Sequence, residues 1–109
     1  MASGDTLQGT RLPDAVMGEP GPGWDAWETL TDGVRQVTAA PGSYMKVELS
    51  GDRRWCWYVR APSGDIGSLR ENHTITEYED GTITVSPSIV MPHGGRWHGF
   101  LERGAWREC

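Results

Sequence analysis

The sequence predicts one small, mainly β domain. We expect an antiparallel sheet or open barrel of about six short strands with hairpins, preceded by one short helical turn and an extended N-terminal arm. Runs of Thr, Ile and Val alternate on both sides of Asp80-Gly81, which is typical of a hairpin. The 109 residues include 15 glycines and 7 prolines, which favour tight turns over long helices. Six tryptophans supply an aromatic core, because each ring buries roughly 150–250 Å².

Residues 1–23 are predicted to form an arm before a single β domain of residues 24–109. Their Leu, Val and Met residues follow no sustained period, and the segment closes on Gly-Glu-Pro-Gly-Pro-Gly. Alone, such a segment buries too little apolar surface to offset the entropy of ordering. It is therefore either a flexible tail or an arm that becomes ordered on a partner or a neighbouring subunit. In the second case its apolar contacts would be Leu12, Val16 and Met17.

A short helical segment is predicted next, because Trp24, Trp27 and Leu30 are spaced at i, i+3 and i+6. We expect one or two turns laid on the sheet by their aromatic side, ending before Gly33. Two roles stay open for Trp24 and Trp27. They either pack in the core or form part of a surface that binds a partner.

Alternating residues from Val34 onward predict a hairpin of two strands, residues 44–49 and 53–60. On the second strand the alternation places Trp55, Trp57 and Val59 on one face. The other face carries an aromatic and basic set, namely Arg54, Cys56, Tyr58 and Arg60. Arginines interleaved with a tyrosine resemble a stacking platform for nucleic acid. Alternatively, the arginine stems cover apolar surface and balance nearby acids. Residues 61–72 are expected to form a loop.

The central hairpin is predicted over residues 73–90, with Asp80 and Gly81 as a two-residue type I′ turn. This register puts Tyr78 opposite Ile83 and Thr76 opposite Val85 on the apolar face. The opposite face then carries the solvated set Glu77, Glu79, Thr82 and Thr84. Pro87 cannot donate to a sheet ladder, so we expect it at an edge or a bulge.

A closing hairpin is predicted over residues 96–106, with a two-residue turn at Arg103-Gly104. The turn would set Trp97, Gly99 and Leu101 on one face and His98 and Phe100 on the other. Gly99 indicates a bulge or an aromatic ring packed on bare backbone. We expect Trp106 to cap the core.

The formal net charge of −5 is unevenly placed. Residues 1–33 carry six acidic residues and one basic residue, whereas residues 34–109 carry nine of each. An acidic balance disfavours non-specific binding to nucleic acid or to anionic membranes. No apolar run approaches the roughly 20 residues of a membrane span, and residues 1–23 lack the features of a signal peptide. Cys56 and Cys109 do not make a disulfide framework, which indicates a reducing compartment.

A zinc site is one chemical hypothesis, because the chain has the right ligand types. These are His73, His93 and His98, with Cys56 or Cys109. Their spacing matches neither Cys-x-x-Cys nor His-Glu-x-x-His. We therefore expect no metal and no other cofactor; if a metal site exists, His93 and His98 are its predicted ligands.

Hydrolysis is a second chemical hypothesis. Ser86 and Ser88 lie near His98 in the sequence, and Glu77 or Asp80 would be the acidic member of a catalytic triad. The sequence has no nucleophile elbow, however, and Pro87 explains both serines as turn residues. We expect no enzymatic activity.

Two motifs in the second half of the chain are distinctive as a pair. One is Gly81-Thr-Ile-Thr-Val-Ser-Pro-Ser-Ile89, and the other is Trp97-His98-Gly99-Phe100-Leu101, followed by Gly104-Ala105-Trp106. Together they resemble a family of short proteins of unknown function encoded by actinobacterial phages and prophages. The resemblance covers roughly residues 44–109. It implies a phage origin and carries over no catalytic residue.

These observations predict a non-catalytic, phage-type interaction or structural protein. It would be a virion accessory or assembly component that contacts a protein partner, or further copies of itself, through its N-terminal segment. An open β domain with unpaired edges and an arm suits strand addition to a neighbour. Two alternatives stay open: a host-directed inhibitor that occupies a partner's site, and a small zinc-binding module. The expected location is the host cytoplasm or the virion.

Overall fold

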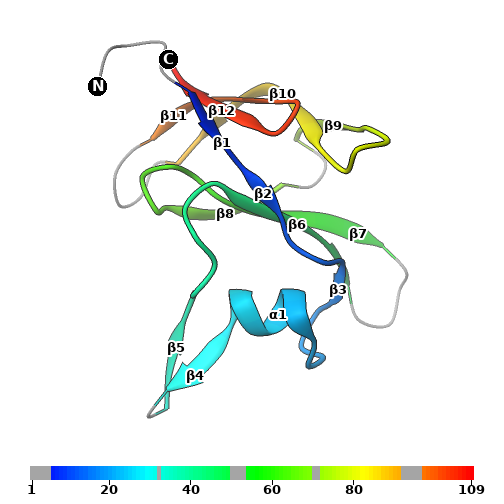
Figure 1. The fold of residues 1–109 in the computed structure, drawn as a ribbon, viewed down its shortest axis with the longest axis vertical. Coiled ribbons are helices and arrows are strands. Elements are labelled where there is room, and N and C mark those ends of the chain that lie inside the picture. Colours follow the sequence, from blue (N-terminus) through cyan, green and yellow to red (C-terminus); the bar gives the residue numbers. More distant parts are fainter. Residues whose placement is uncertain (1–5, 32, 50–53, 70–71, 92–96) are drawn as a thin grey trace.

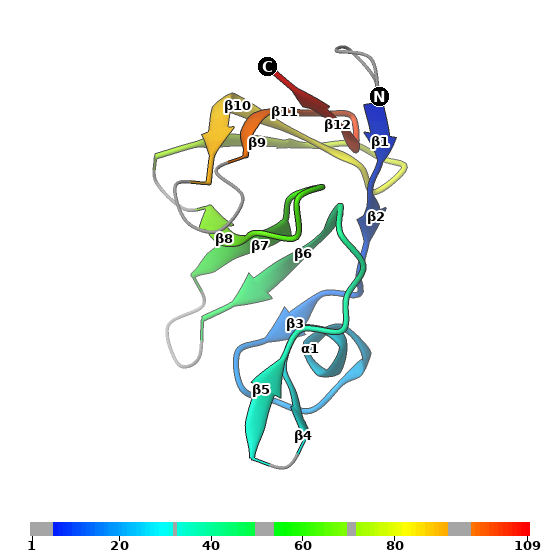
Figure 2. The same cartoon turned by 90° about the vertical axis from the view of Figure 1, so that its left-hand side faces the viewer.

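A computed structural model describes residues 6–31, 33–49, 54–69, 72–91 and 97–109. The elements form three layers (Figures 1 and 2). A five-stranded sheet, sheet A, lies over a second five-stranded sheet, sheet B, and a short helix with a two-stranded hairpin lies under sheet B. The mainly β prediction is thus confirmed. The described residues form two five-stranded sheets and one two-stranded hairpin, which do not close into a barrel, and they contain twelve strands rather than about six.

Sheet A is antiparallel throughout, in the order β1-β12-β11-β10-β9. Its strands are β1 (Thr6–Gln8), β9 (Thr74–Glu77), β10 (Ile83–Val90), β11 (His98–Glu102) and β12 (Ala105–Glu108). The first strand therefore pairs with the last. Strand β1 thus forms one edge of sheet A, and its neighbour β12 is the last strand in the sequence.

Sheet B is mixed, in the order β2-β6-β7-β8, with β3 also pairing with β6. Its strands are β2 (Thr10–Arg11), β3 (Ala15–Val16), β6 (Ser43–Glu48), β7 (Trp55–Arg60) and β8 (Ile66–Leu69). The predicted hairpin of β6 and β7 is confirmed by its antiparallel register. The expectation of a loop over residues 61–72 is wrong, because β8 forms there and pairs with β7.

Strand β6 is buried on both faces, because it lies in the middle layer. Tyr44 is 1% exposed and faces sheet A, while the neighbouring Met45 is 0% exposed and faces the helix layer. The predicted alternation of β7 is likewise confirmed: Trp57 belongs to the core between the sheets and Cys56 to the core under sheet B. Two cores therefore share one pair of central strands.

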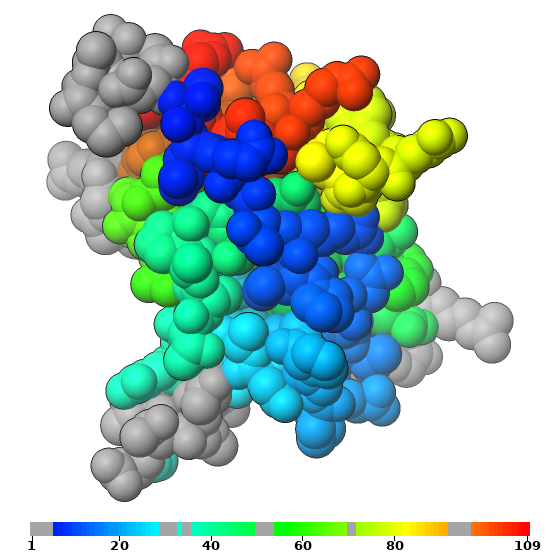
Figure 3. Space-filling view, in the orientation of Figure 1, coloured from blue at the N-terminus to red at the C-terminus, as the bar shows by residue number. Residues whose placement is uncertain are grey.

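The segment predicted as an arm is paired within the chain itself. Thr6 to Gln8 add a strand to β12, and residues 10–16 add β2 and β3 alongside β6. Figure 3 shows this segment crossing one face of the molecule from the upper layer to the lower one. The crossing occurs at Gly9, where an added Cβ would lie 2.9 Å from the carbonyl oxygen of Gly104. Backbone pairing through β1, β2 and β3 holds this segment on the domain, together with Leu12, Ala15 and Met17, which pack against the core under sheet B.

Helix α1 (Pro22–Trp27) starts two residues before the predicted helical turn and is shorter than the aromatic spacing suggested. Pro22 occupies the first turn, where its missing N–H is not needed. The chain leaves the helix after Trp27 and forms a hairpin of β4 (Thr29–Thr31) and β5 (Val34–Gln36), with Gly33 at positive φ in the turn. Leu30 therefore lies in a strand and not on the helix.

The register predicted for the central hairpin is wrong by one residue. Ile83 pairs with Glu77 and Val85 pairs with Ile75. The loop has three residues instead of two: the N–H of Gly81 donates to the carbonyl oxygen of Tyr78 at 3.0 Å, and only Gly81 in the loop has positive φ. The shift places Ile75, rather than Thr76, on the core face with Val85.

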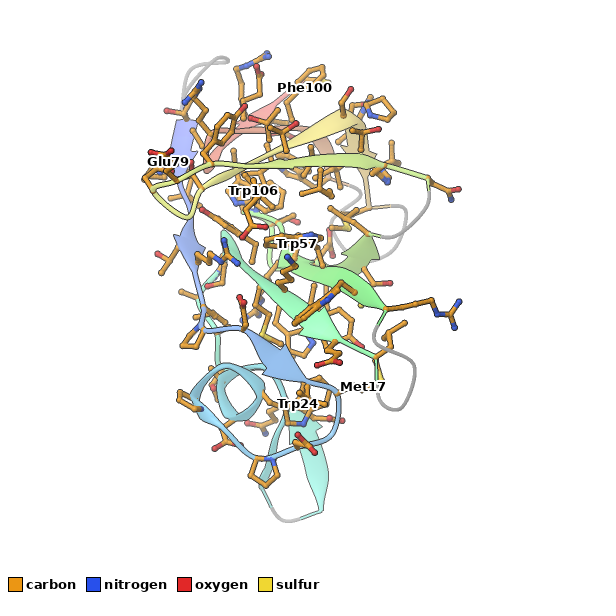
Figure 4. The ribbon with its side chains drawn as sticks, turned by 90° about the vertical axis from the view of Figure 1, so that its right-hand side faces the viewer. Met17, Trp24, Trp57, Glu79, Phe100 and Trp106 are labelled. Carbon is orange, nitrogen blue, oxygen red and sulfur yellow. The ribbon has the colours of Figure 1, made fainter. Side chains whose placement is uncertain are left out.

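The closing hairpin forms as predicted. Leu101 pairs with Trp106, and Arg103 and Gly104 both have positive φ, as a type I′ turn requires. The ring of Trp97 covers the bare backbone of Gly99. Trp97 also meets Trp106 edge to face, with ring centroids 5.4 Å apart. Trp106 is 1% exposed and lies between the two sheets (Figure 4), so it caps the core as expected.

Pro87 lies at an irregularity in β10. The register of β10 against β11 shifts between Val85 and Ile89, and Pro87 falls inside this interval. A residue without an N–H is tolerated where the ladder is already interrupted. The prediction of an edge or a bulge is confirmed.

Candidate functional site

An open apolar groove of about 510 Å³ lies between sheet B and the helix layer. Three groups of described residues line it. The helix layer contributes Trp24, Trp27, Glu28, Gln36 and Val37; the sheet contributes Tyr58, Ile66, Gly67 and Ser68; and Met17 comes from the connection between β3 and α1. Figure 4 shows Trp24 and Met17 on the side of sheet B that faces away from sheet A.

Three aromatic rings form the inner wall of the groove. The ring of Tyr58 lies 5.3 Å from that of Trp27 and 6.0 Å from that of Trp24, both at tilted angles. Trp27 is 6% exposed and serves the core as well as the groove, whereas Trp24 is half-buried. Tilted aromatic contacts of this kind hold the rings in place without a ligand. The wall is therefore preformed.

The outer wall of the groove is strand β8. Ile66 is 50% exposed, and both Ile66 and Ser68 lie on the same face of sheet B as their cross-strand partners Arg60 and Tyr58. Ile66 thus extends the apolar surface of the aromatic wall toward the edge of sheet B.

The structure brings together four of the residues that the sequence singled out for binding. Met17, Trp24, Trp27 and Tyr58 all line the groove. Leu12 and Val16, the other two residues predicted to bind a partner, do not line the groove. Leu12 packs against the core under sheet B, and Val16 of β3 pairs with Glu48 of β6. The contribution of Ile66 was missed, because residues 61–72 were interpreted as a loop.

The basic residues of the predicted sheet face lie in two different settings. The guanidinium of Arg60 donates to three backbone carbonyls, those of Val37, Ala39 and Gly64. It thereby fixes the loops on either side of the groove. Arg54 is exposed and lies directly before β7. Tyr58 contacts the rings of Trp24 and Trp27.

The residues weighed for hydrolysis are only partly brought together. Nε2 of His98 lies 2.9 Å from Oγ of Ser88, on the outer face of sheet A. Glu77 and Asp80 lie at the other end of the β9–β10 hairpin, where Glu77 pairs with Arg11 and Asp80 accepts from Thr82. Within the described ranges, His98 therefore has a serine neighbour but lacks the carboxylate that would orient it.

The residues weighed for zinc are not gathered into a site in the described part of the chain. His73 contacts the carbonyl oxygen of Ser88 at 3.2 Å, Cys56 is buried, and Cys109 is exposed. His93 lies outside the described residues. Among residues with described positions, no group of three or more His, Cys, Asp or Glu side chains could hold a metal ion.

The described lining of the groove is mostly apolar, with a few polar groups. It contains Glu28 and the Tyr58 phenol but no histidine, cysteine or lysine. Large aromatic faces with a few polar groups at the rim are typical of surfaces that recognise protein segments.

Charged side chains join the two sheets on the side of the molecule where β2 crosses. Arg11 Nη1 lies 2.7 Å from Glu77 Oε2, and Lys46 Nζ lies 3.2 Å from Glu77 Oε1. The hydrogen bond from Arg11 holds the pKa of Glu77 below its usual value, with Lys46 adding to the effect. The Arg11 guanidinium also lies over the Trp57 ring at 5.0 Å. This cluster is internally satisfied and stabilises the fold.

Comparisons with protein-family models, with curated proteins and with solved structures yielded no match to this chain. Along the described ranges, no helix has the length and apolar character required to cross a membrane. The functional conclusion therefore depends on the groove and on the residues that line it.

Proposed function

We propose that this chain is a non-catalytic, phage-type interaction protein, a virion accessory or assembly component, that binds a protein partner through the groove between sheet B and the helix layer. The observation that carries the proposal is the meeting of Met17, Trp24, Trp27 and Tyr58 at one open apolar surface. These residues come from the N-terminal segment and from the sheet face, the two regions from which the sequence predicted partner contacts.

The composition of the groove supports a protein partner. Aromatic and methionine side chains are enriched at protein interfaces, and Trp and Tyr dominate interface hot spots. Ile66 is exposed and Trp24 is half-buried, so both offer apolar surface in the groove. The phage origin is supported by the motif resemblance of residues 81–89 and 97–106.

Particle composition tests the proposal. Phage particles are purified from cultures that produce the wild type, Trp24→Ala or Trp24→Phe, and the protein is quantified by mass spectrometry. The wild type and Trp24→Phe are expected in the particles at a constant copy number. Trp24→Ala is expected to be depleted roughly 30-fold, since truncation of an aromatic hot spot costs about 2 kcal/mol or more. Melting temperatures of the isolated variants establish that depletion is not caused by unfolding.

Particle composition and native mass spectrometry separate the two alternatives. Absence of the wild type from particles, together with early expression, contradicts the virion role and favours a host-directed inhibitor. Native mass spectrometry of the untagged protein addresses the zinc-binding module. A zinc-sized mass increment that is lost in both His93→Ala and His98→Ala would favour that module over the groove.

A further inference from the structure

Strand β8 is an edge strand. Within the described ranges its backbone pairs with β7 on one side and with no strand on the other. Ile66 and Ser68 are both exposed. An exposed strand edge presents unpaired N–H and C=O groups that another chain can use.

The register identifies which backbone groups face this open edge. The N–H of Ala61 donates to the carbonyl oxygen of Asp65 at 2.8 Å, at the turn end of the β7–β8 ladder. Hydrogen-bonded pairs alternate with non-bonded pairs in an antiparallel ladder. The bonded pairs are therefore Val59 with Gly67 and Trp57 with Leu69. Ile66 and Ser68, between them, direct their N–H and C=O groups away from β7.

The open edge runs beside the groove. Ile66 and Ser68 direct their side chains to the face of sheet B that carries Tyr58, and all three line the groove. A strand added next to β8 would place every second side chain on that same face. Those side chains would lie over the groove, opposite Trp24 and Trp27.

The layer opposite β8 is acidic. Residues 22–36, which contain α1 and the β4–β5 hairpin, include three acidic residues and one basic residue, a net charge of −2. Glu28 lines the groove itself. A segment that approaches β8 from this side is favoured by positive charge, because opposite potentials attract and like charges across an interface are costly.

We infer that the groove receives an extended basic segment of the partner protein, which adds to β8 as a further strand. Its backbone pairs with the N–H and C=O groups of Ile66 and Ser68, and a large apolar side chain at alternate positions enters the groove against Trp24 and Tyr58. Lysine or arginine residues flank that anchor. This inference rests on the proposed binding function of the groove and specifies how the partner binds.

Selection from a displayed library of random 12-residue peptides tests the inference. The full-length wild type is the bait, and Tyr58→Ala is the counter-selection. Enriched peptides are expected to carry large apolar residues at alternate positions with Lys or Arg on either side. A synthetic peptide of the enriched sequence then serves as the ligand for amide hydrogen exchange by NMR. The amides of Ile66 and Ser68 should exchange at least tenfold more slowly in the complex, whereas those of Gly67 and Leu69 should change little.

A proline at the edge provides a second test. Ser68→Pro removes an N–H that faces the open edge and leaves the β7–β8 bonds of Gly67 and Leu69 available. Ser68→Thr is the matched control, because it keeps the N–H. Affinity for the peptide should fall roughly tenfold for Ser68→Pro relative to Ser68→Thr. If Ser68→Pro does not fold, the exchange measurement on the wild type decides alone.

The outcomes distinguish the two levels of the proposal. Peptides that need Tyr58 but leave the Ile66 and Ser68 amides unprotected overturn strand addition and leave the binding function of the groove standing. Enriched acidic peptides overturn the assigned partner chemistry. A selection in which no peptide is enriched over Tyr58→Ala overturns both the inference and the groove as a binding site for peptide segments.

Discussion

Arg11 and Glu77 are 66 residues apart in sequence, and their side chains meet at 2.7 Å. Arg11 lies on β2 in sheet B and Glu77 on β9 in sheet A, so the ion pair joins the two sheets. Arg11 also donates to the carbonyl oxygen of Gly81 at 3.1 Å and to Asp14 at 2.9 Å. One guanidinium thereby fixes the loop of the central hairpin against the N-terminal segment.

The first prediction concerns acid stability. The hydrogen bond from Arg11 lowers the pKa of Glu77 in the folded state, so the pair stabilises the protein above the unfolded pKa of Glu77. This contribution is lost as pH falls through the lowered, folded pKa. Glu77→Gln should lower the free energy of unfolding by about 0.2–1 kcal/mol at pH 7, the range for exposed ion pairs.

Urea unfolding of wild type and Glu77→Gln between pH 7 and pH 2 checks this sign. The two unfolding free energies should converge at the acidic end, and 1 M NaCl should reduce the difference at pH 7. Glu79→Gln is the matched control on the same hairpin. A difference that grows as the pH falls would contradict the assignment.

The second prediction concerns the three-residue loop of the central hairpin. Gly81 has a φ of +88°. Gly81→Val should destabilise the protein by about 1–2 kcal/mol, because a β-branched residue is strained at positive φ. Gly81→Asn should retain most of the stability, since asparagine tolerates this conformation. Equal melting temperatures for the wild type and Gly81→Val would show that the loop is assigned incorrectly.

The third prediction concerns the contact between Trp97 and Gly99. An added Cβ at Gly99 would overlap both the Trp97 ring and the backbone of Arg107. Gly99→Ala should therefore cost about 1–3 kcal/mol through overpacking. Gly21→Ala is the control, because a Cβ there meets no atom within 4 Å. Urea denaturation separates the two, and comparable losses for both variants would rule out the packing explanation.

The fourth prediction separates the two tryptophans of α1. Trp27→Ala should lower the free energy of unfolding by about 3–5 kcal/mol, because Trp27 is 6% exposed. Trp24 is half-buried, so Trp24→Ala should cost clearly less while removing partner binding. Thermal unfolding followed by circular dichroism gives the comparison. If Trp24→Ala lowers the free energy of unfolding as much as Trp27→Ala does, the main role of Trp24 is in the core.

Local sequence patterns predicted the elements whose partners are close in sequence. The turn and the two faces of the closing hairpin were predicted correctly. A turn at Arg103-Gly104 and the alternation of Trp97, Gly99 and Leu101 both indicate the same register. The central hairpin was predicted one residue out of register. Asp-Gly fits both a two-residue and a three-residue loop, and the choice depends on whether Ile75 or Thr76 faces the core.

Pairing between distant segments left no local signal. Strands β1, β2 and β3 have two or three residues each, too few to show a period, and their partners lie far along the chain. The spacing of Trp24 and Trp27 predicted a short helix and left a partner-binding surface as one of their two possible roles, and both residues line the groove. The outer wall of the groove depends on β8, whose Ile-Gly-Ser-Leu sequence resembles a loop until β7 pairs with it.

The pairing of β1 with β12 also constrains the order of events during synthesis. Thr6 pairs with Arg107, and Gly9 donates to the carbonyl oxygen of Gly104 at 2.7 Å. During translation, β1 therefore emerges from the ribosome long before its partner strand β12 has been synthesised. Contacts so distant in sequence slow folding, because loop closure must precede them. Sheet A can be completed only after β12 has emerged from the exit tunnel, and until then the nascent chain carries the unpaired β1 as a potential site for chaperone binding.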